Sequence, residues 1–176
     1  TGAIGRHERY VAIWTMDKGE IAMKELAPAT GFKVAVVGSG AWGSALACHA
    51  AKLGHEVEIR EAGPVAGGMI HFGIPAYRMP RKELQAEIDR IENMGVKITL
   101  NHRVEDVLAE KDDGGFDAVF VAVGAHISKK IDIPSREAGK ILDAVSFLSS
   151  TKQGEVPRLG RRVAIYGGGN TAMDAA

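Results

Sequence analysis

The chain has 176 residues, of which 45% are hydrophobic and 25% charged, and its 22 basic residues balance its 22 acidic ones. This composition is ordinary for a globular protein and excludes disordered and collagen-like classes. Because the net charge is zero, no basic field is available for non-specific nucleic-acid binding, and we expect no nucleic-acid partner.

The cysteine count and the short apolar runs exclude further classes. With one cysteine, Cys48, the chain can form neither an internal disulfide, nor a zinc site of several thiolates, nor a four-cysteine iron–sulfur cluster. We therefore assign no metal site and expect a reducing, cytoplasmic setting. The apolar runs at 34–37 and 118–123 are far shorter than the roughly 20 residues of a membrane helix, so no membrane insertion is expected.

The first half of the chain alternates helical and strand patterns. Residues Ile4 to Leu26 mix apolar and charged side chains and predict one or two short helices, broken near Asp17 to Gly19. The β-branched run at 33–37 predicts a buried parallel strand that enters a glycine turn. An alanine-rich helix over Trp42–Leu53 and a second strand at Glu56–Arg60 follow.

The second half continues this alternation. Residues 81–95 carry Leu84, Ile88, Ile91 and Met94 at spacings of four, three and three, which predicts an amphipathic helix. Two strands follow, at Val96–Leu100 and Asp117–Val123, and then a short helix at Asp143–Ser150. The run RRVAIY at 161–166 predicts another strand that ends in glycines. Because the chain begins without methionine and stops inside a predicted helix, we expect both ends to be cut.

The turn after the first strand reads Gly38-Ser39-Gly40-Ala41-Trp42-Gly43, which has the G-x-G-x-x-G spacing. The first glycine permits the sharp turn, the second lets the backbone approach a pyrophosphate, and the third lets helix and strand pack closely. Glu61 stands at the end of the second strand, where a carboxylate accepts hydrogen bonds from a ribose and repels a 2′-phosphate. The pattern therefore predicts a dinucleotide site.

A glycine- and proline-rich connection from Gly63 to Pro80 is long for an ordinary dehydrogenase domain, and connections of this length are usually functional. Gly67 and Gly68 would let the backbone approach a ligand, and Arg78 supplies a permanent cation.

Five motifs in order carry a family resemblance from about Phe32 to the final residue. They are the glycine loop, the acid followed by P-x-x-G-G-M/L, the strings GIPAYRMP and FVAVGA, and the string GGGNTAMDAA. With these motifs the chain resembles the small subunit of glutamate synthase. Relatives include the flavin part of dihydropyrimidine dehydrogenase and NADH-dependent ferredoxin:NADP oxidoreductases.

The resemblance implies two cofactor sites. FAD would be held by Gly38, Ser39, Gly40, Ala41, Trp42, Gly43, Glu61, Ala62, Gly67, Gly68, Met69, Arg78, Val104 and Gly124. NADPH or NADH would be held by Gly167, Gly168, Gly169, Asn170, Thr171 and Ala172, and the choice between NAD and NADP stays open. The family usually has Pro-Ala where this chain has Ala41-Trp42, so the indole would either crowd the pyrophosphate or pack onto a neighbouring loop.

The expected architecture is α/β. It comprises a helical lead-in (1–31), a Rossmann-like FAD-binding domain with a parallel sheet and no return segment (32–160), and the start of a second Rossmann-like, NAD(P)-binding domain (161–176). The resemblance implies an oxidoreductase within a larger complex that passes hydride from NAD(P)H to FAD and electrons to an iron–sulfur domain or subunit. The cofactors perform this chemistry, so we assign no catalytic acid or base, and we expect no activity from the chain alone.

Two alternatives stay open. The stretch GSGAWGSALA also resembles the nicotinamide loop of glycerol-3-phosphate dehydrogenases, which would bind NADH and no flavin. The other alternative is a non-catalytic nucleotide-binding scaffold, made plausible by Trp42 and by the missing sequence.

Overall fold

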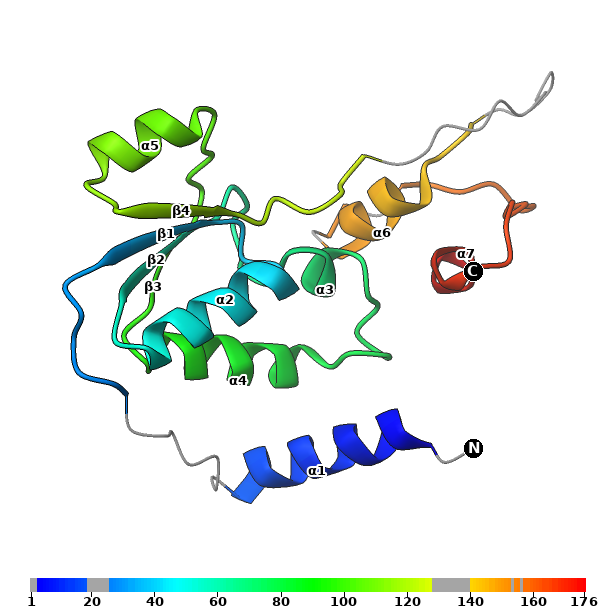
Figure 1. Cartoon of the computed structure of the whole chain (residues 1–176). Coiled ribbons are helices and arrows are strands. Elements are labelled where there is room, and N and C mark those ends of the chain that lie inside the picture. Colours follow the sequence, from blue (N-terminus) through cyan, green and yellow to red (C-terminus); the bar gives the residue numbers. More distant parts are fainter. Residues whose placement is uncertain (1–2, 19–25, 128–139, 153, 156) are drawn as a thin grey trace.

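The computed structural model describes residues 3–18, 26–127, 140–152, 154–155 and 157–176 (Figure 1). The elements in chain order are α1 (Ile4–Lys18), β1 (Lys33–Val37), α2 (Ala41–Lys52), β2 (Glu56–Arg60), α3 (Gly68–Phe72), α4 (Arg81–Glu92), β3 (Lys97–Thr99), α5 (Val107–Asp113), β4 (Ala118–Val121), α6 (Ala144–Lys152) and α7 (Asn170–Ala175).

The four strands form one parallel sheet in the order β3-β2-β1-β4. The chain crosses from β1 to β2 through α2 and from β2 to β3 through α4, and both helices lie on the same face of the sheet (Figure 1). Since all strands run in one direction, their carboxyl ends meet at one edge, where open α/β sheets bind ligands. The expected Rossmann-like α/β class with a parallel sheet is confirmed.

The core lies between the sheet and these two helices. Val36, Val57 and Ile59 pack against small residues of α2, which are Ala47, Ala50 and Ala51, and against Ile91 and Met94. Alanine at these helix positions lets the helix axis approach the strands closely. The predicted apolar stripe of the 81–95 helix is confirmed, because Leu84, Ile88, Ile91 and Met94 are all buried.

The lead-in forms one helix, α1, which ends at Lys18, within the predicted break. Residues 19–25 lie outside the described part. The helix buries none of its residues, and its Arg9 contacts the rest of the fold. This side chain donates to the carbonyl of Arg78 at 3.1 Å and forms an ion pair with Glu83 at 3.5 Å.

The predicted strand at 161–166 is wrong. Among the described residues this segment forms no strand, and Val163, Ile165 and Tyr166 are exposed. A strand requires a neighbour for its backbone hydrogen bonds, and each of the four strands pairs only within its own sheet. The run therefore keeps the apolar pattern of a strand without the pairing.

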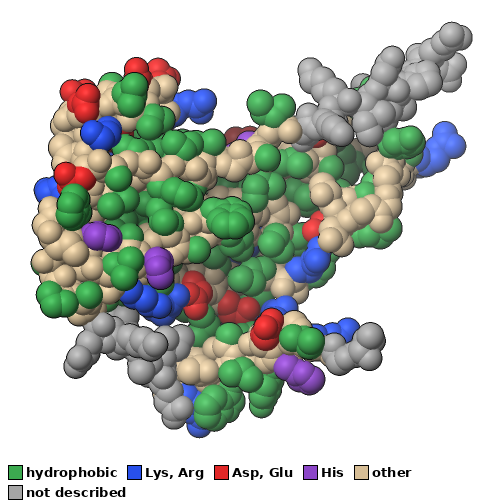
Figure 2. Space-filling model, in the orientation of Figure 1, with side chains coloured by type: hydrophobic (Ala, Val, Ile, Leu, Met, Phe, Trp, Pro, Cys, Tyr) green, Lys and Arg blue, Asp and Glu red, His purple; other side chains and the backbone are tan. Residues whose placement is uncertain are grey.

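The surface of the molecule carries many hydrophobic side chains, and Figure 2 shows them gathered on the visible face. The exposed large hydrophobic residues include Trp42 on α2, and Phe120, Val121 and Val123 on β4 and its continuation. These four residues flank the carboxyl edge of the sheet. None of the helices in the described ranges is long and apolar enough to cross a membrane.

Candidate dinucleotide site

A cleft of about 900 Å³ opens at the carboxyl edge of the sheet, and we call it the sheet-edge cleft. Of the predicted site residues, it is lined by Gly38, Ser39, Gly40, Ala41, Trp42, Glu61, Ala62, Gly68, Met69, Val104 and Gly124. These residues come from five separate segments of the chain. The fold therefore brings most of the predicted first site together, in a cleft of the size usual for small-molecule sites.

The three glycines of the first loop have different surroundings. Gly38 has φ +103°, and a Cβ there would stand 2.5 Å from the Ala122 carbonyl oxygen. A Cβ on Gly43 would stand 1.9 Å from the Gly38 carbonyl oxygen, so α2 can leave β1 only with glycine at this position. Gly40 is the exception, because no atom beyond the residue itself and its two chain neighbours lies within 4 Å of the place of its Cβ.

Gly40, with this open space beside it, stands at the start of a helix. Gly40 is the N-cap of α2 and provides no side-chain hydrogen bond to the first turn. The first backbone N–H groups of a helix have no partners within it, and they carry the positive end of the helix dipole. The loop is thus built to receive an anionic group such as a pyrophosphate.

Glu61 follows β2 and is already aimed at the loop. Its Oε2 accepts from the backbone N–H of Ser39 at 2.9 Å and from the Ser39 hydroxyl, and its Oε1 accepts from the N–H of Gly63 at 2.7 Å. A carboxylate accepts about four hydrogen bonds. Glu61 can therefore hold the loop in place and still accept from a sugar hydroxyl.

The paired glycines complete this arrangement. Gly67 is buried with φ +111°, and its N–H donates to the Ser39 hydroxyl at 3.0 Å. Gly68 has φ +51°, and a Cβ there would stand 2.9 Å from the Gly40 Cα. Gly67 supports the loop from behind, whereas Gly68 lines the sheet-edge cleft.

Sequence reasoning missed several residues of the cleft wall. Arg60, His102 and Arg103 line it, together with Phe120–Val123. A signal was present, because all of these residues stand at or just beyond the carboxyl ends of β2, β3 and β4, where the ligands of open parallel sheets bind.

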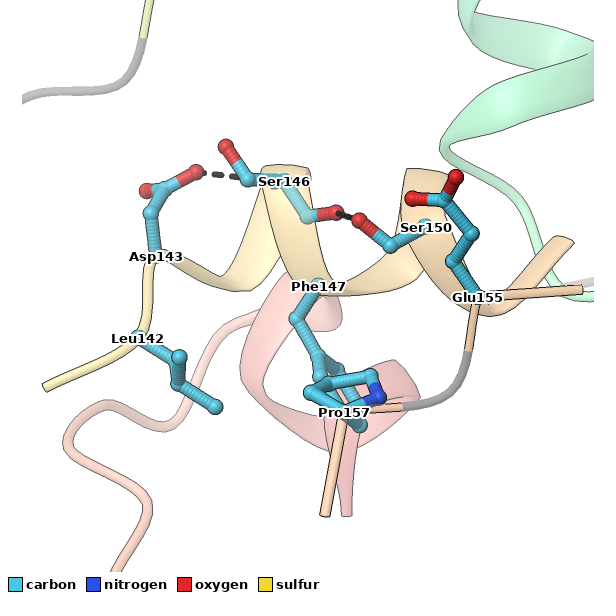
Figure 3. Close-up of a pocket in the computed structure, with 7 residues that line it drawn as sticks. All are labelled: Leu142, Asp143, Ser146, Phe147, Ser150, Glu155 and Pro157. Atoms are coloured by element: carbon cyan, nitrogen blue, oxygen red, sulfur yellow. Dashed lines mark hydrogen bonds between the residues drawn. The ribbon is translucent and has the colours of Figure 1, made fainter. Parts of the chain in front are cut away.

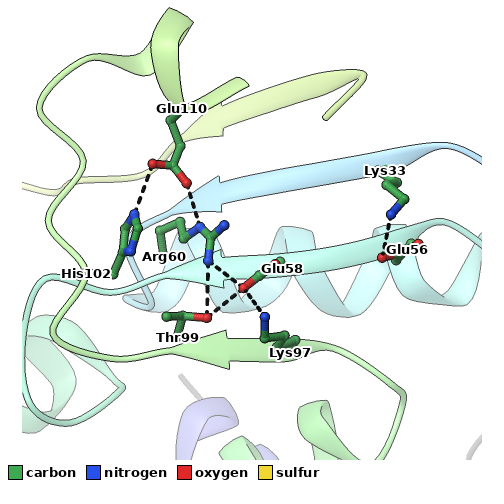
Figure 4. Close-up of polar contacts among 8 residues, drawn as sticks. All are labelled: Lys33, Glu56, Glu58, Arg60, Lys97, Thr99, His102 and Glu110. Atoms are coloured by element: carbon green, nitrogen blue, oxygen red, sulfur yellow. Dashed lines mark hydrogen bonds and ion pairs between the residues drawn. The ribbon is translucent and has the colours of Figure 1, made fainter. Parts of the chain in front are cut away.

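Charged side chains on β2 and on the segments beside it are paired with one another (Figure 4). Arg60 contacts Glu58 at 2.5 Å and Glu110 at 2.7 Å, and His102 contacts Glu110 at 3.0 Å. The hydrogen bond from His102, assisted by Arg60, outweighs burial and lowers the pKa of Glu110. Burial opposes the charged form of Glu58, but hydrogen bonds from Thr99 and Lys97, together with Arg60, lower its pKa.

Arg78, which the resemblance places on FAD, does not line the sheet-edge cleft. Its Nη1 donates to both carboxylate oxygens of Asp174, at 2.8 and 2.9 Å, and the Tyr77 hydroxyl reaches the same carboxylate at 3.3 Å. The hydrogen bond to Asp174 raises the pKa of Arg78. The loop after α3 and the helix after the second glycine loop are thereby joined.

The second glycine loop stands apart from the first. Gly167 has φ +134°, and Gly169 is the N-cap of α7, which contains Asn170, Thr171 and Ala172. None of its six predicted residues, Gly167 to Ala172, lines the sheet-edge cleft. The predicted turn into a helix is present, although the strand expected before it is not.

A smaller hollow of about 350 Å³ lies beside α6, lined by Leu142, Asp143, Ser146, Phe147, Ser150, Glu155 and Pro157 (Figure 3). None of the predicted site residues lines it. Its polar groups also serve the helix, since Asp143 accepts from the N–H of Ser146 at 2.8 Å and the Ser150 hydroxyl donates to the carbonyl of Ser146 at 2.9 Å. Within the ranges that the structure describes, no group of three or more His, Cys, Asp or Glu side chains could hold a metal ion.

The fold and the sheet-edge cleft define a Rossmann-like domain of the dinucleotide-binding class. The model of the family described as NAD(P)-binding Rossmann-like domain matches residues 36–75, which span the first loop and Glu61. Among solved structures, Mycobacterium tuberculosis FprA in complex with NADPH has a TM-score of 0.53 and 23% identity, over 68% of this chain and 28% of FprA. This likeness shows the fold.

Sequence relatives are more specific. The chain is 43% identical to NADP(+)-dependent formate dehydrogenase subunit beta of Moorella thermoacetica, over 84% of this chain and 21% of that protein. It is 42% identical to NADPH-Fe(3+) oxidoreductase subunit beta of Geobacter sulfurreducens, over 81% of this chain and 22% of that protein. It is 32% identical to the glutamate synthase [NADPH] small chain of Escherichia coli, over 97% of this chain and 39% of that protein.

These matches confirm the resemblance predicted from the motifs. The chain belongs to the family of glutamate synthase small chains and of the beta subunits of NADPH-dependent oxidoreductases. It spans between about a fifth and two fifths of the length of these relatives.

Proposed function

We propose that the chain binds FAD in the sheet-edge cleft and belongs to an enzyme that passes hydride from NAD(P)H to FAD and electrons on to iron–sulfur clusters. The observation that carries the proposal is the convergence of the first glycine loop, Glu61, Met69, Val104 and Gly124 on one cleft. These motif residues lie up to 86 positions apart in the sequence, and the edge where the parallel sheet brings them together is the place where open α/β sheets bind ligands.

The residues present fit a flavin dinucleotide. The open side of Gly40 admits a pyrophosphate onto the N-terminus of α2, while the carboxylate of Glu61 receives the hydroxyls of the adenosine ribose. The apolar residues after β4 and the side chain of Met69 offer surface for flat rings. The bound flavin would supply the hydride-accepting ring, and the protein supplies orientation and electrostatics.

The remaining parts of the proposal follow from the motifs and the relatives. Residues 1–31 are a lead-in, 32–160 the FAD-binding domain, and 161–176 the start of the NAD(P)H-binding domain. The names of the relatives describe subunits and a small chain, which supports assembly into a larger complex. With Cys48 as its one cysteine, this chain needs a partner or a further domain to provide the iron–sulfur clusters.

The test is a titration of the purified protein with FAD, followed by the quenching of flavin fluorescence and by retention of the yellow colour on gel filtration. Glu61→Gln should weaken FAD binding by roughly tenfold or more, because hydrogen bonds to charged groups contribute about 1.5–3 kcal/mol. Glu92→Gln, an exposed change at the end of α4, should leave it unchanged. A wild-type protein that retains no flavin would refute the proposal.

A second candidate is NAD(P) in the same cleft. The specific observation in its favour is that the matching family model, which spans the first loop, is described as NAD(P)-binding. Titration with NADH and NADPH, followed by nicotinamide fluorescence, separates the candidates. Binding of either nucleotide more tightly than FAD, and in competition with FAD, would favour the second one.

A further inference from the structure

One carboxylate, that of Glu110 on α5, contacts the side chains of two residues at the wall of the sheet-edge cleft (Figure 4). Its Oε1 accepts from Arg60 Nε at 2.7 Å, and its Oε2 lies 3.0 Å from His102 Nε2. The Glu110 and Arg60 side chains are only 15% and 14% exposed, so this contact is largely shielded from water.

Both of these residues adjoin the backbone of Glu61. Arg60 is its neighbour in the chain at the end of β2, and the N–H of His102 donates to the Glu61 carbonyl at 2.8 Å. The N–H of Glu61 in turn donates to the Thr99 carbonyl at 2.9 Å. Glu110 therefore contacts the side chains of two residues that adjoin Glu61. Arg60 precedes Glu61 in the chain, and His102 is hydrogen-bonded to its carbonyl.

Arg60 makes three side-chain hydrogen bonds within the protein, through its Nε and Nη1 atoms. Besides Glu110, it binds Glu58 at 2.5 Å and the Thr99 hydroxyl at 3.3 Å, and it stands 5.5 Å from the centre of the Phe116 ring. Two carboxylates, those of Glu58 and Glu110, thus bind the guanidinium of Arg60, which also lines the cleft. Its role is to hold the end of β2 in place.

We propose that Glu110 is a positioning residue for the ribose-binding carboxylate of Glu61, acting through Arg60 and His102. The inference rests on the proposed function, because it assigns Glu61 to the sugar of the bound dinucleotide. A binding group must be held within about 0.5 Å of its productive position by the residues behind it. The glycine-loop fingerprint does not include a residue like Glu110, so no motif predicts it.

The experiment is a double-mutant cycle on FAD affinity with Glu110→Gln and Glu61→Gln. Glu110→Gln should weaken FAD binding roughly tenfold, by analogy with the loss of outer partners of binding groups. In the Glu61→Gln protein the same change should cost less than about twofold, because the group that it positions no longer binds as a carboxylate. Glu105→Gln, an exposed change in the same segment, is the matched control.

His102→Ala provides a second variant in case Glu110→Gln does not fold, which far-UV circular dichroism and urea unfolding would report. It removes one of the two contacts of Glu110 and keeps the backbone hydrogen bond to Glu61. Its loss of affinity should also disappear in the Glu61→Gln background. Equal losses in both backgrounds, or no loss in either, would overturn the positioning role.

The same titrations distinguish a failure of the proposed function from a failure of the positioning role alone. If the wild-type protein binds NADH instead of FAD, the cycle is run with NADH, since Glu61 would hold the ribose of either dinucleotide. A wild-type protein that binds neither ligand refutes the proposed function before any variant is made, and the positioning role falls with it. A wild-type protein that binds, with Glu110 and Glu61 acting independently, refutes the positioning role alone.

Discussion

Two glycines of the first loop, three residues apart, should respond in opposite ways to the same substitution. A Cβ on Gly43 would stand 1.9 Å from the Gly38 carbonyl oxygen and 3.2 Å from Val36 Cγ1. Because even a close C–H···O contact is roughly 3.3 Å long, α2 would have to move by more than about 1 Å. Overpacking typically costs about 1–3 kcal/mol, so Gly43→Ala should destabilise the fold by at least about 2 kcal/mol.

A Cβ on Gly40 meets no atom within 4 Å beyond the residue itself and its two chain neighbours, and the residue has φ −67°, which alanine readily adopts. Gly40→Ala should therefore cost less than about 1 kcal/mol, mainly through the weaker N-cap. It should nevertheless weaken FAD binding at least tenfold, because the added methyl group would occupy the approach to the start of α2.

Thermal unfolding and FAD titration of both variants test this contrast. For a chain of this size, about 2 kcal/mol corresponds to a fall in Tm of roughly 4–8 °C. The reasoning would be refuted if Gly43→Ala unfolded like the wild type, or if Gly40→Ala kept full affinity for FAD.

Three further predictions concern Trp42, Arg78 and Glu110. The indole of Trp42 is 80% exposed, so Trp42→Ala should change the free energy of unfolding by less than about 0.5 kcal/mol. It should also remove most of the quenching of tryptophan fluorescence by FAD without lowering affinity, and a large loss of affinity would show instead that the indole binds the cofactor. If Arg78 binds FAD, as the resemblance implies, Arg78→Ala should weaken FAD binding, whereas Asp174→Asn should strengthen it at low salt by releasing the guanidinium. Equilibrium dialysis checks both variants. Unchanged affinities would show that Arg78 serves in the ion pair with Asp174 and does not bind FAD. Because the folded-state pKa of Glu110 is lowered, its contribution to stability is present above the unfolded pKa of about 4.3 and is lost as the pH falls through the folded value. Urea unfolding between pH 6 and pH 3 should thus show a shallower loss of stability for Glu110→Gln than for the wild type, and parallel curves would contradict this assignment.

The sequence predicts the four strands and the helices α2 and α4 because their patterns are local. A β-branched run such as 33–37 and the stripe of Leu84, Ile88 and Ile91 fix which faces are buried. The short helices α3 and α5 were missed. α5 does have a signal, since Asp106 caps it by accepting from the N–H groups of Leu108 and Ala109, whereas α3 begins at a glycine, which has a low helix propensity.

The errors concern features that depend on other parts of the chain. The run at 161–166 has the composition of a strand, but a strand exists only where another strand pairs with it. Composition cannot report that partner. In the same way, Arg60 reads as an ordinary strand residue, and its importance emerges only when Glu110, fifty residues later, lies beside it.

Hydrogen bonds within the protein hold the site together, and Ser39 is the residue through which this occurs. Its hydroxyl donates to Glu61 and accepts from the N–H of Gly67, and its own N–H donates to Glu61. Ser39 is 1% exposed, so these bonds are shielded from competing water. A loop fixed in this way loses little conformational entropy on binding. Its geometry is therefore set by the protein. The pair Ala41-Trp42, which stands where the family usually has Pro-Ala, lies outside these contacts. It can alter which ligand the cleft accepts without altering how the loop is held.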